Sequence, residues 1–270
     1  MMVAIIMSVY KKDKALPLYW AMQSLLHQTY KNLLIFIRLD GDVETDVETL
    51  LFTLQKNYQN IILSRNSVNL GLGYSLNKLI DTILLDHPDI QFIARMDADD
   101  ICHLSRIQRQ VECLDKTPSI DVLGTACQEF GLYNRVITKK DTDVLLKKNI
   151  LKTSPFIHPS VIFRRKIFED GNRYPLNTFL SEDLALWLDL SLKGYGFGNL
   201  NEALLFYRIN NVTLKRRSNI KKAISELIIR FRYLKVKKNN IVFNCLWIAG
   251  HLILKIMPVC LVRVAYRLFR

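Results

Sequence analysis

Gln91-Phe-Ile-Ala-Arg-Met-Asp97-Ala-Asp99-Asp100 stands near the middle of a chain of 270 residues. Its apolar part predicts a short buried strand that ends at Asp97, and the spacing of Asp97 and Asp99 points both carboxylates the same way in an extended chain. Hard divalent cations such as Mg²⁺ or Mn²⁺ take oxygen ligands, usually one or two carboxylates plus substrate phosphates. Because open α/β sheets bind ligands at the carboxyl ends of their strands, the stretch indicates a metal–diphosphate site. The alternative is an acidic turn that caps a helix beginning near Ser105.

Strands and helices alternate over the first hundred residues. Continuous apolar runs predict the strands, and apolar residues at helical spacing predict the helices between them. The expected strands are residues 3–9, 33–39, 61–64 and 92–96, and the expected helices are residues 17–28, 43–58 and a stretch through Leu76 and Leu84. This order predicts an α/β fold with a mainly parallel central sheet flanked by helices. Further along, we expect helices at residues 105–117 and 184–193 and strands at residues 120–130 and 156–163.

The glycine-containing stretch Asn69-Leu-Gly-Leu-Gly73 precedes the third expected helix. Glycines let a backbone approach a phosphate closely, and they also form the turn at the start of a helix. The sequence has no G-x-G-x-x-G after its first strand, so it lacks the fingerprint of a dinucleotide site. We favour the turn.

Two further positions allow both a structural and a functional interpretation. Glu182 and Asp183 stand at the start of an expected helix, where the helix dipole alone stabilises acids. A carboxylate held there can also face a substrate and accept a proton as a general base. His158 precedes Pro159, and a lone histidine is more often structural than a ligand.

The excess charge of the chain lies at its C-terminal end. The chain has 38 Lys or Arg and 25 Asp or Glu, a formal net charge of +13. Residues 211–270 contain 14 Lys or Arg and a single acid, Glu226, so the first 210 residues are neutral. A basic segment implies an anionic partner, either membrane lipid or nucleic acid. We therefore divide the chain into a domain at residues 1–210 and a basic, apolar helical tail at residues 211–270.

The tail passes from a basic helix to an apolar segment. Residues 216–238 have helical spacing, with an apolar stripe formed by Ile220, Ala223, Ile224, Leu227 and Ile228. Residues 241–262 are almost wholly apolar and long enough to span a bilayer, but Pro258 would break a helix there. Three polar residues of the segment fall on one helical face: Asn244, His251 and Lys255. They favour a helix lying in the membrane interface over one packed on the protein or one spanning the bilayer.

Two features favour a cytoplasmic protein. The five cysteines are scattered without a C-x-x-C pair, as expected of reduced thiols. Residues 1–7 lack a basic region and a small-residue cleavage site, so we expect a first strand there and not a signal peptide.

The order of these motifs resembles that of the inverting family 2 glycosyltransferases, which have the nucleotide-binding GT-A fold. Four motifs carry the resemblance: Met7-Ser-Val-Tyr10 with Ser24-Leu-Leu-His-Gln28-Thr-Tyr, Asn69-Leu-Gly-Leu-Gly-Tyr-Ser-Leu-Asn77, Ala94-Arg-Met-Asp97-Ala-Asp99-Asp100, and Glu182-Asp183 followed by Leu186-Trp187. Two weaker motifs agree with them: Pro155-Phe-Ile-His158-Pro-Ser-Val, and Lys193-Gly-Tyr-Gly-Phe-Gly-Asn with Tyr207-Arg208. Together they span residues 3–208 in the order of the family.

On the donor side, the resemblance implies a role for each matching residue. Ser8 and Tyr10 would lie at the nucleotide base, and Asp40 near the uridine. Asp97 would approach the ribose and the metal, and Asp99 would bind the Mn²⁺ or Mg²⁺ that bridges the donor diphosphate.

On the acceptor side, the resemblance makes Asp183 the catalytic base, with Glu182, Trp187 and His158 beside the acceptor. The mechanism implied is a single in-line displacement, in which the acceptor hydroxyl attacks the anomeric carbon opposite the nucleoside diphosphate. An α-linked donor would therefore give a β-linkage.

Three residues depart from the pattern of the family. Leu39 stands where an acid often precedes the second-strand acid, which weakens the case for a uracil contact. Ser105 stands where an Asp commonly precedes Arg106, and Ala185 replaces an acid often found two residues after the base.

The expected function is transfer of a hexose, galactose or glucose before N-acetylhexosamine, from a UDP-sugar. The expected acceptor is a polyprenyl-diphosphate-linked saccharide of O-antigen or capsule synthesis, and the expected location is peripheral, at an anionic membrane surface on the cytoplasmic face of the inner membrane. A sugar-phosphate nucleotidyltransferase is the alternative enzyme, but it would need an Arg-bearing glycine loop after the first strand, which residues 8–13 lack. A nucleic-acid-binding protein is the non-catalytic alternative. The excess positive charge is confined to a tail that has few aromatic residues, which disfavours this alternative. We therefore expect no nucleic-acid partner.

Overall fold

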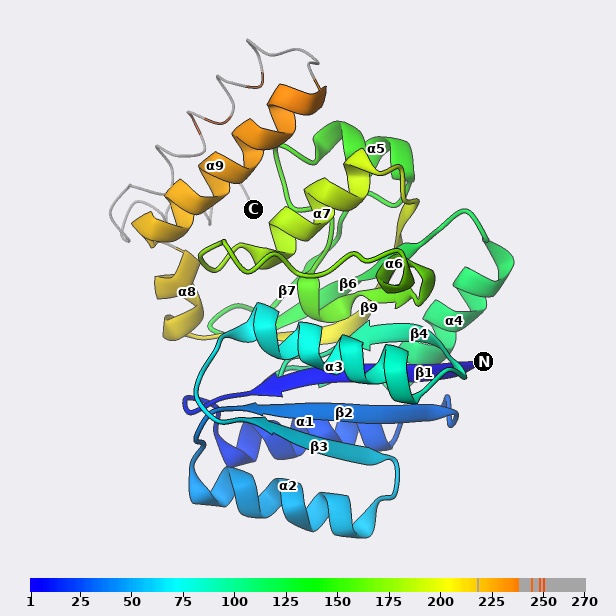
Figure 1. Ribbon diagram of the computed structural model, residues 1–270, viewed down its shortest axis with the longest axis vertical. Helices are drawn as coiled ribbons and strands as arrows, with labels where there is room; N and C mark the ends of the chain where they lie inside the picture. Colours follow the sequence, from blue (N-terminus) through cyan, green and yellow to red (C-terminus); the bar gives the residue numbers. More distant parts are fainter. Residues whose placement is uncertain (218, 238–243, 245–247, 249, 251–270) are drawn as a thin grey trace.

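The computed structural model describes residues 1–217, 219–237, 244, 248 and 250, and these residues form a nine-stranded sheet with helices on both faces (Figure 1). The strands are β1 Met2–Val9, β2 Leu33–Asp40, β3 Ile61–Asn66, β4 Ile90–Arg95, β5 Ile101–Cys102, β6 Val122–Gly131, β7 Arg135–Ile137, β8 Ile162–Arg164 and β9 Phe197–Ile209. The helices are α1 Ala15–Leu26, α2 Thr45–Asn57, α3 Leu72–Asp86, α4 Arg106–Lys116, α5 Asp143–Asn149, α6 Lys166–Glu169, α7 Glu182–Leu192, α8 Asn211–Arg217 and α9 Ile220–Lys237, with a 3₁₀ turn at His158–Ser160.

The sheet combines a parallel half with a mixed half. Its strand order is β3-β2-β1-β4-β8-β6-β9-β5, and β7 pairs with β6. β3, β2, β1 and β4 are parallel neighbours, whereas β8 runs antiparallel to both β4 and β6. The four parallel strands are those predicted from apolar runs, and the centres of β1, β2 and β4 are buried on both faces. The predicted α/β fold with a mainly parallel sheet flanked by helices is confirmed.

Two apolar layers cover the sheet. On one face, Leu76 and Ile80 of α3 belong to the same buried cluster as Trp187 of α7. On the other face, Leu18 of α1 and Leu51 of α2 belong to a second cluster. The loops that follow β1, β2 and β4 meet at one edge of the sheet, because the carboxyl ends of parallel strands lie side by side.

Two segments differ from the sequence-based expectation. The strand expected at residues 156–163 is wrong in its first part, because His158–Ser160 forms a 3₁₀ turn and only Ile162–Arg164 pairs as β8. Pro159 stands at the start of this turn, has no N–H to donate to a ladder and fixes its own φ. The 13-residue strand β9 was not predicted, because exposed Asn201 and Glu202 interrupt its apolar pattern.

The helical first part of the tail is present, and it packs on the rest of the protein. α9 lies along α7 (Figure 1), and its buried residues Ile229, Tyr233 and Leu234 belong to the cluster that contains Trp187. The Tyr233 hydroxyl oxygen lies 3.3 Å from Oγ of Ser191 on α7. The division at residue 210 stays a prediction, but α9 shares a core with the residues before it.

The expected apolar stripe of α9 is present, and it is split: Leu227 packs against the buried cluster, but most of the stripe faces outward. Ala223 is buried, whereas Ile220, Ile224 and Ile228 are exposed. Buried Arg230 and Glu226 occupy part of the packed face instead. The packed side of α9 therefore combines apolar residues with a buried ion pair, and most of the apolar stripe lies on the outer side.

The apolar segment expected at residues 241–262 lies outside the described residues, apart from positions 244, 248 and 250. Ile248 is 2% exposed and belongs to the same cluster as Ile229 and Tyr233. Within the described ranges, no helix combines the length and the apolar character needed to cross a membrane.

The packing of α9 can be tested at Arg230, which is 4% exposed. Its guanidinium donates to the Leu151 carbonyl oxygen, and Nη2 lies 3.5 Å from Oε2 of Glu226. Arg230→Met leaves both acceptors buried without their cation, so we expect the free energy of unfolding in urea to fall by about 2–4 kcal/mol. Exposed Lys235→Met should change it by less than about 0.5 kcal/mol. If both variants unfold like the wild type, α9 does not belong to the cooperative fold.

Candidate active site

Three carboxylates meet directly after β4. One oxygen from each of Asp97, Asp99 and Asp100 lies within 4.8 Å of the others. Asp97 and Asp99 are half-buried, and Asp100 is 1% exposed. Carboxylates so close to one another repel, so the surrounding protein has to supply positive charge.

Arg95, the last residue of β4, supplies part of this charge. Its side chain is 2% exposed, and its Nη1 forms an ion pair with Oδ1 of Asp97. Burial lowers the pKa of Arg95, but the ion pair with Asp97, together with Tyr174 and Asp100, outweighs burial and raises that pKa above its ordinary value. Arg95 is therefore a fixed cation beneath the acids.

Arg208 of β9 holds the acidic loop from the other side. Its backbone N–H donates to Oδ1 of Asp100 at 2.7 Å, and its Nε donates to the Asp99 carbonyl oxygen at 2.8 Å. Its guanidinium lies 4.5 Å from the centre of the Phe130 ring. The pairing of β5 with β9, which aligns Ile101 with Phe206, brings Arg208 to the loop. The sequence contained Arg208 in a weak motif but gave no sign of this contact.

The oxygen donors fit a divalent cation. Burial raises the pKa of Asp100 well above its ordinary value, and Asp97 and Asp99 raise it further. Oδ2 of Asp100 has no hydrogen-bond partner among the described residues. Mg²⁺ and Mn²⁺ prefer such clustered hard oxygen donors, and either ion would relieve the repulsion. Asp97, Asp99 and Asp100 are the residues that would hold the ion.

The predicted nucleotide-binding residues lie along the same edge of the sheet. β1 pairs with both β2 and β4, and the Met96 N–H donates to the Ile6 carbonyl oxygen at 3.1 Å, so Ser8 and Tyr10 follow β1 close to where Asp97 follows β4. Ser8 and Tyr10 are both half-buried.

Asp40, at the end of β2, holds the glycine loop. Its Oδ1 accepts from the Leu70 N–H at 2.8 Å and its Oδ2 from the Gly71 N–H at 2.9 Å. Asn66 donates to Oδ1 as well, at 2.8 Å. Gly71 has a φ of +92° directly before α3, a conformation that favours glycine, so the loop forms the expected turn at a helix start. A uridine contact of Asp40, which is 3% exposed, stays a prediction.

The acidic pair Glu182 and Asp183 forms the first turn of α7. Oδ1 of Asp183 accepts from the Leu184 N–H at 2.8 Å. Burial raises the pKa of Glu182, and the adjacent Asp183 carboxylate raises it further. A Cβ built on Gly73 would lie 3.6 Å from Cβ of Glu182, an ordinary van der Waals distance, so the start of α3 packs next to the start of α7.

A buried polar group joins the two sets of acids. Tyr174 is 1% exposed, and its pKa is raised by burial and, less strongly, by Asp183, Glu182 and Asp97. Asn77 of α3 fixes the Tyr174 backbone, because its amide donates to the carbonyl oxygen and accepts from the N–H, both at 2.8 Å. Tyr174 is therefore within electrostatic range of both the acids that follow β4 and those of α7.

His158 and Trp187 have mainly structural contacts. Nε2 of His158 lies 3.0 Å from the Tyr174 hydroxyl oxygen, and burial, helped by Arg95 and Lys222, keeps the pKa of His158 well below its ordinary value. Trp187 is 0% exposed and stacks on Phe163, with ring centres 5.6 Å apart. The structure thus places Trp187 in the core beneath α7, and an acceptor contact of His158 stays a prediction.

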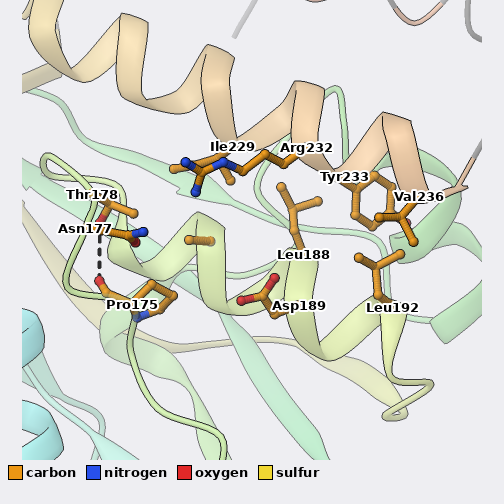
Figure 2. Close-up of a pocket in the computed structure, with 11 residues that line it drawn as sticks. Pro175, Asn177, Thr178, Leu188, Asp189, Leu192, Ile229, Arg232, Tyr233 and Val236 are labelled. Carbon is orange, nitrogen blue, oxygen red and sulfur yellow. Dashed lines mark hydrogen bonds between the residues drawn. The ribbon is translucent and has the colours of Figure 1, made fainter.

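A hollow of about 260 Å³ lies away from these acids, between α7, α9 and the loop at residues 175–178 (Figure 2). Its lining contains no predicted site residue. The candidate site is therefore defined by its charged groups and not by this hollow.

Comparison with known proteins agrees with this geometry. Residues 4–171 match the sequence model of Glycosyl transferase family 2. The "UDP-Gal:alpha-D-GlcNAc-diphosphoundecaprenol beta-1,3-galactosyltransferase" of Escherichia coli is 30% identical over 236 residues, which cover 85% of this chain and 82% of that protein. The "Amylovoran biosynthesis glycosyltransferase AmsE" of Erwinia amylovora is 25% identical over 270 residues, which cover 98% of each chain.

Solved structures share the fold at low sequence identity. S. aureus TarS 1-349 in complex with UDP has a TM-score of 0.64 at 14% identity, covering 95% of this chain and 81% of that chain. The mannosyltransferase PcManGT from Pyrobaculum calidifontis, in complex with GDP-Man and Mn²⁺, has a TM-score of 0.65 at 13% identity. The match covers 98% of this chain and 79% of that chain. Both are similar to this chain over nearly its full length.

The raised pKa of Glu182 gives a prediction about stability. A carboxyl group whose pKa is higher in the folded than in the unfolded state lowers the free energy of unfolding at pH values above its unfolded pKa, which is about 4.3 for Glu. At pH values below both pKa values the group is protonated in both states and has no such effect. Glu182→Gln should therefore raise the free energy of unfolding at pH 8, and the gain should disappear as pH falls toward about 4. Urea unfolding at both pH values measures this.

Glu112→Gln, at a partly exposed position of α4, is the control and should show no such pH-dependent gain. An equal gain at both pH values, or a loss at pH 8, would show that Glu182 is not held against an unfavourable environment.

Proposed function

The chain belongs to glycosyl transferase family 2, and we propose that it moves a hexose from a UDP-sugar to a hydroxyl of a lipid-linked saccharide with inversion at the anomeric carbon. The name of the E. coli relative supports UDP as the nucleotide and a diphosphoundecaprenol-linked acceptor. Galactose or glucose is the proposed sugar, ahead of N-acetylhexosamine. Membership of the family favours a glycosyltransferase over the nucleotidyltransferase alternative, and the expectation of no nucleic-acid partner stays a prediction.

One observation carries the proposal: the acids after β4 and the acids at the start of α7 act on the same buried groups. The carboxylates of Asp97, Glu182 and Asp183 all contribute to the raised pKa of Tyr174. Arg95, which pairs with Asp97, also offsets a small part of the rise in the pKa of Glu182. A donor whose diphosphate lay at the β4 acids would therefore have its sugar beside the α7 acids.

In the proposed reaction each carboxylate has a separate task. Asp99, with Asp97 and Asp100, would hold the Mn²⁺ or Mg²⁺, which when bound stabilises the negative charge on the leaving diphosphate. Asp183 accepts the proton of the acceptor hydroxyl while that oxygen bonds to the anomeric carbon and the bond to the diphosphate breaks. Glu182 lies beside it at the acceptor.

The nucleotide would lie along the edge formed by β1, β2 and β4. Ser8 and Tyr10 are proposed at the base and Asp97 at the ribose. Asp40 would act there through the glycine loop that it holds, since its carboxylate already accepts hydrogen bonds from Leu70 and Gly71.

The acceptor implies a membrane. We place the enzyme peripherally at the cytoplasmic face of the inner membrane, in bacterial O-antigen or capsule synthesis. The support is the acceptor in the name of the E. coli relative and the basic residues after position 210.

The base assignment is tested by Asp183→Asn, which keeps the size of the side chain and removes its affinity for a proton. Transfer from a UDP-sugar should fall by about 10²–10⁴-fold, while the affinity for UDP in calorimetry stays unchanged. Asp189→Asn, on the same helix, is the matched control and should keep full activity. Normal turnover by Asp183→Asn would move the base elsewhere, with Glu182 as the first residue to examine.

The metal assignment is tested by Asp99→Ala. Transfer with Mn²⁺ should fall by at least about 10²-fold, and excess EDTA should abolish transfer by the wild type. Exposed Asp115→Ala controls for loss of a surface acid. Full activity in EDTA would leave the three acids as a turn that only shapes the loop.

A further inference from the structure

We infer that the outer face of α9, together with the loop at residues 176–179, is a docking surface for an anionic lipid bilayer. The inference rests on the proposed function, because it concerns how the acceptor reaches the site. It assigns membrane contact to a packed part of the protein that borders the acceptor-side acids.

Among the residues that the structure describes, nothing covers an apolar stripe that runs along α9. Ile220, Ile224, Ile228 and Phe231 are 55%, 49%, 45% and 37% exposed. Their spacing of four, four and three residues places them on one side of the helix. The opposite side is buried, so α9 is held firmly while this stripe faces outward.

The stripe is flanked by cations alone. Lys221, Arg232, Lys235 and Lys237 are exposed. The single acid of α9, Glu226, is 9% exposed and pairs with Arg230 on the packed side. The outer face of α9 therefore presents aliphatic, aromatic and cationic side chains without a carboxylate.

The apolar and cationic side chains on the outer face of α9 determine which partner fits it. A second copy of the chain docked face to face would bring like charges together without a compensating acid. An apolar stripe with Lys and Arg on its borders suits the boundary between lipid headgroups and acyl chains, where the stripe enters and the cations meet anionic headgroups. An anionic bilayer is therefore the partner that fits this surface.

The loop before the proposed base extends the surface. Leu176 and Phe179 are 60% and 43% exposed. The Phe179 N–H donates to Oγ of Ser225 on α9 at 3.0 Å, which ties the loop to the helix. The chain continues from this loop directly into Glu182 and Asp183.

The loop at residues 176–179 places the surface beside the site, because it is hydrogen-bonded to α9 and leads directly into the first turn of α7. The positive charge of Lys222 on α9 agrees with this position. It offsets part of the rise in the pKa of Glu182 and contributes to the low pKa of His158. Further along the two helices, Figure 2 shows Arg232 and Val236 of α9 opposite Leu188 and Leu192 of α7, at the hollow that lies away from the acids. A bilayer against α9 would thus lie next to the α7 acids, where the saccharide of a lipid-linked acceptor has to arrive.

The test is flotation of the full chain with vesicles of phosphatidylcholine, with and without phosphatidylglycerol. The wild type should bind the vesicles that contain phosphatidylglycerol, and binding should weaken at high salt. Ile224→Ser/Ile228→Ser should weaken it by about 10-fold or more, and so should Lys221→Glu/Lys235→Glu. Leu85→Ser, an 81% exposed leucine of α3, is the matched control and should bind like the wild type.

Each other outcome overturns the inference. Undiminished binding by both double variants would assign membrane contact to other residues. A wild-type dimer that the serine variant converts to a monomer, without vesicle binding, would make a second copy the occupant.

Transfer to a short soluble acceptor separates this inference from the proposed function. If the double variants keep that activity and lose transfer to lipid-linked acceptor in vesicles, both stand. Vesicle binding as predicted, without transfer from any UDP-sugar, overturns the function alone.

Discussion

The ion pair between Arg95 and Asp97 is the constraint on which the site depends. Three carboxylates follow β4 with oxygens within 4.8 Å, in a position where water is largely excluded from Asp100. Mutual repulsion and desolvation would separate or protonate them unless cations were fixed nearby. Arg95 provides that charge from below, and Arg208 fixes the loop through hydrogen bonds to Asp99 and Asp100. A divalent cation would neutralise the negative charge that remains, and it would in turn bind a diphosphate.

The arrangement of the sheet brings these groups together. β4 lies between parallel β1 and antiparallel β8, so its carboxyl end shares an edge with β1 and β2. The long strand β9, parallel to β6, delivers Arg208 from more than a hundred residues away. On the side of α3, Asn77 fixes Tyr174, and this contact sets the start of the segment that leads to Glu182 and Asp183. The polar network therefore determines where the loops lie, within a fold that the apolar layers stabilise.

The sequence predicted those parts of the fold that depend on local pattern. Apolar runs gave β1, β2 and β4, and acids at the ends of elements gave Asp97, Asp99, Glu182 and Asp183 as candidates. It could not give β9, whose pattern is interrupted by exposed polar residues, or the contact of Arg208. It also gave no sign that Arg230 and Glu226 form a buried pair on the packed side of α9, since charged residues are mostly found at the surface. Long-range pairing decided each of these features.

The most direct test of the account is the configuration of the new glycosidic bond. Proton NMR of the product made from a UDP-sugar with an α-anomeric bond distinguishes the two outcomes. Asp183 as the base, acting on the side opposite a diphosphate held at Asp99, predicts a β-linked product. An α-linked product would mean retention of configuration and would contradict the single displacement between these two sets of acids.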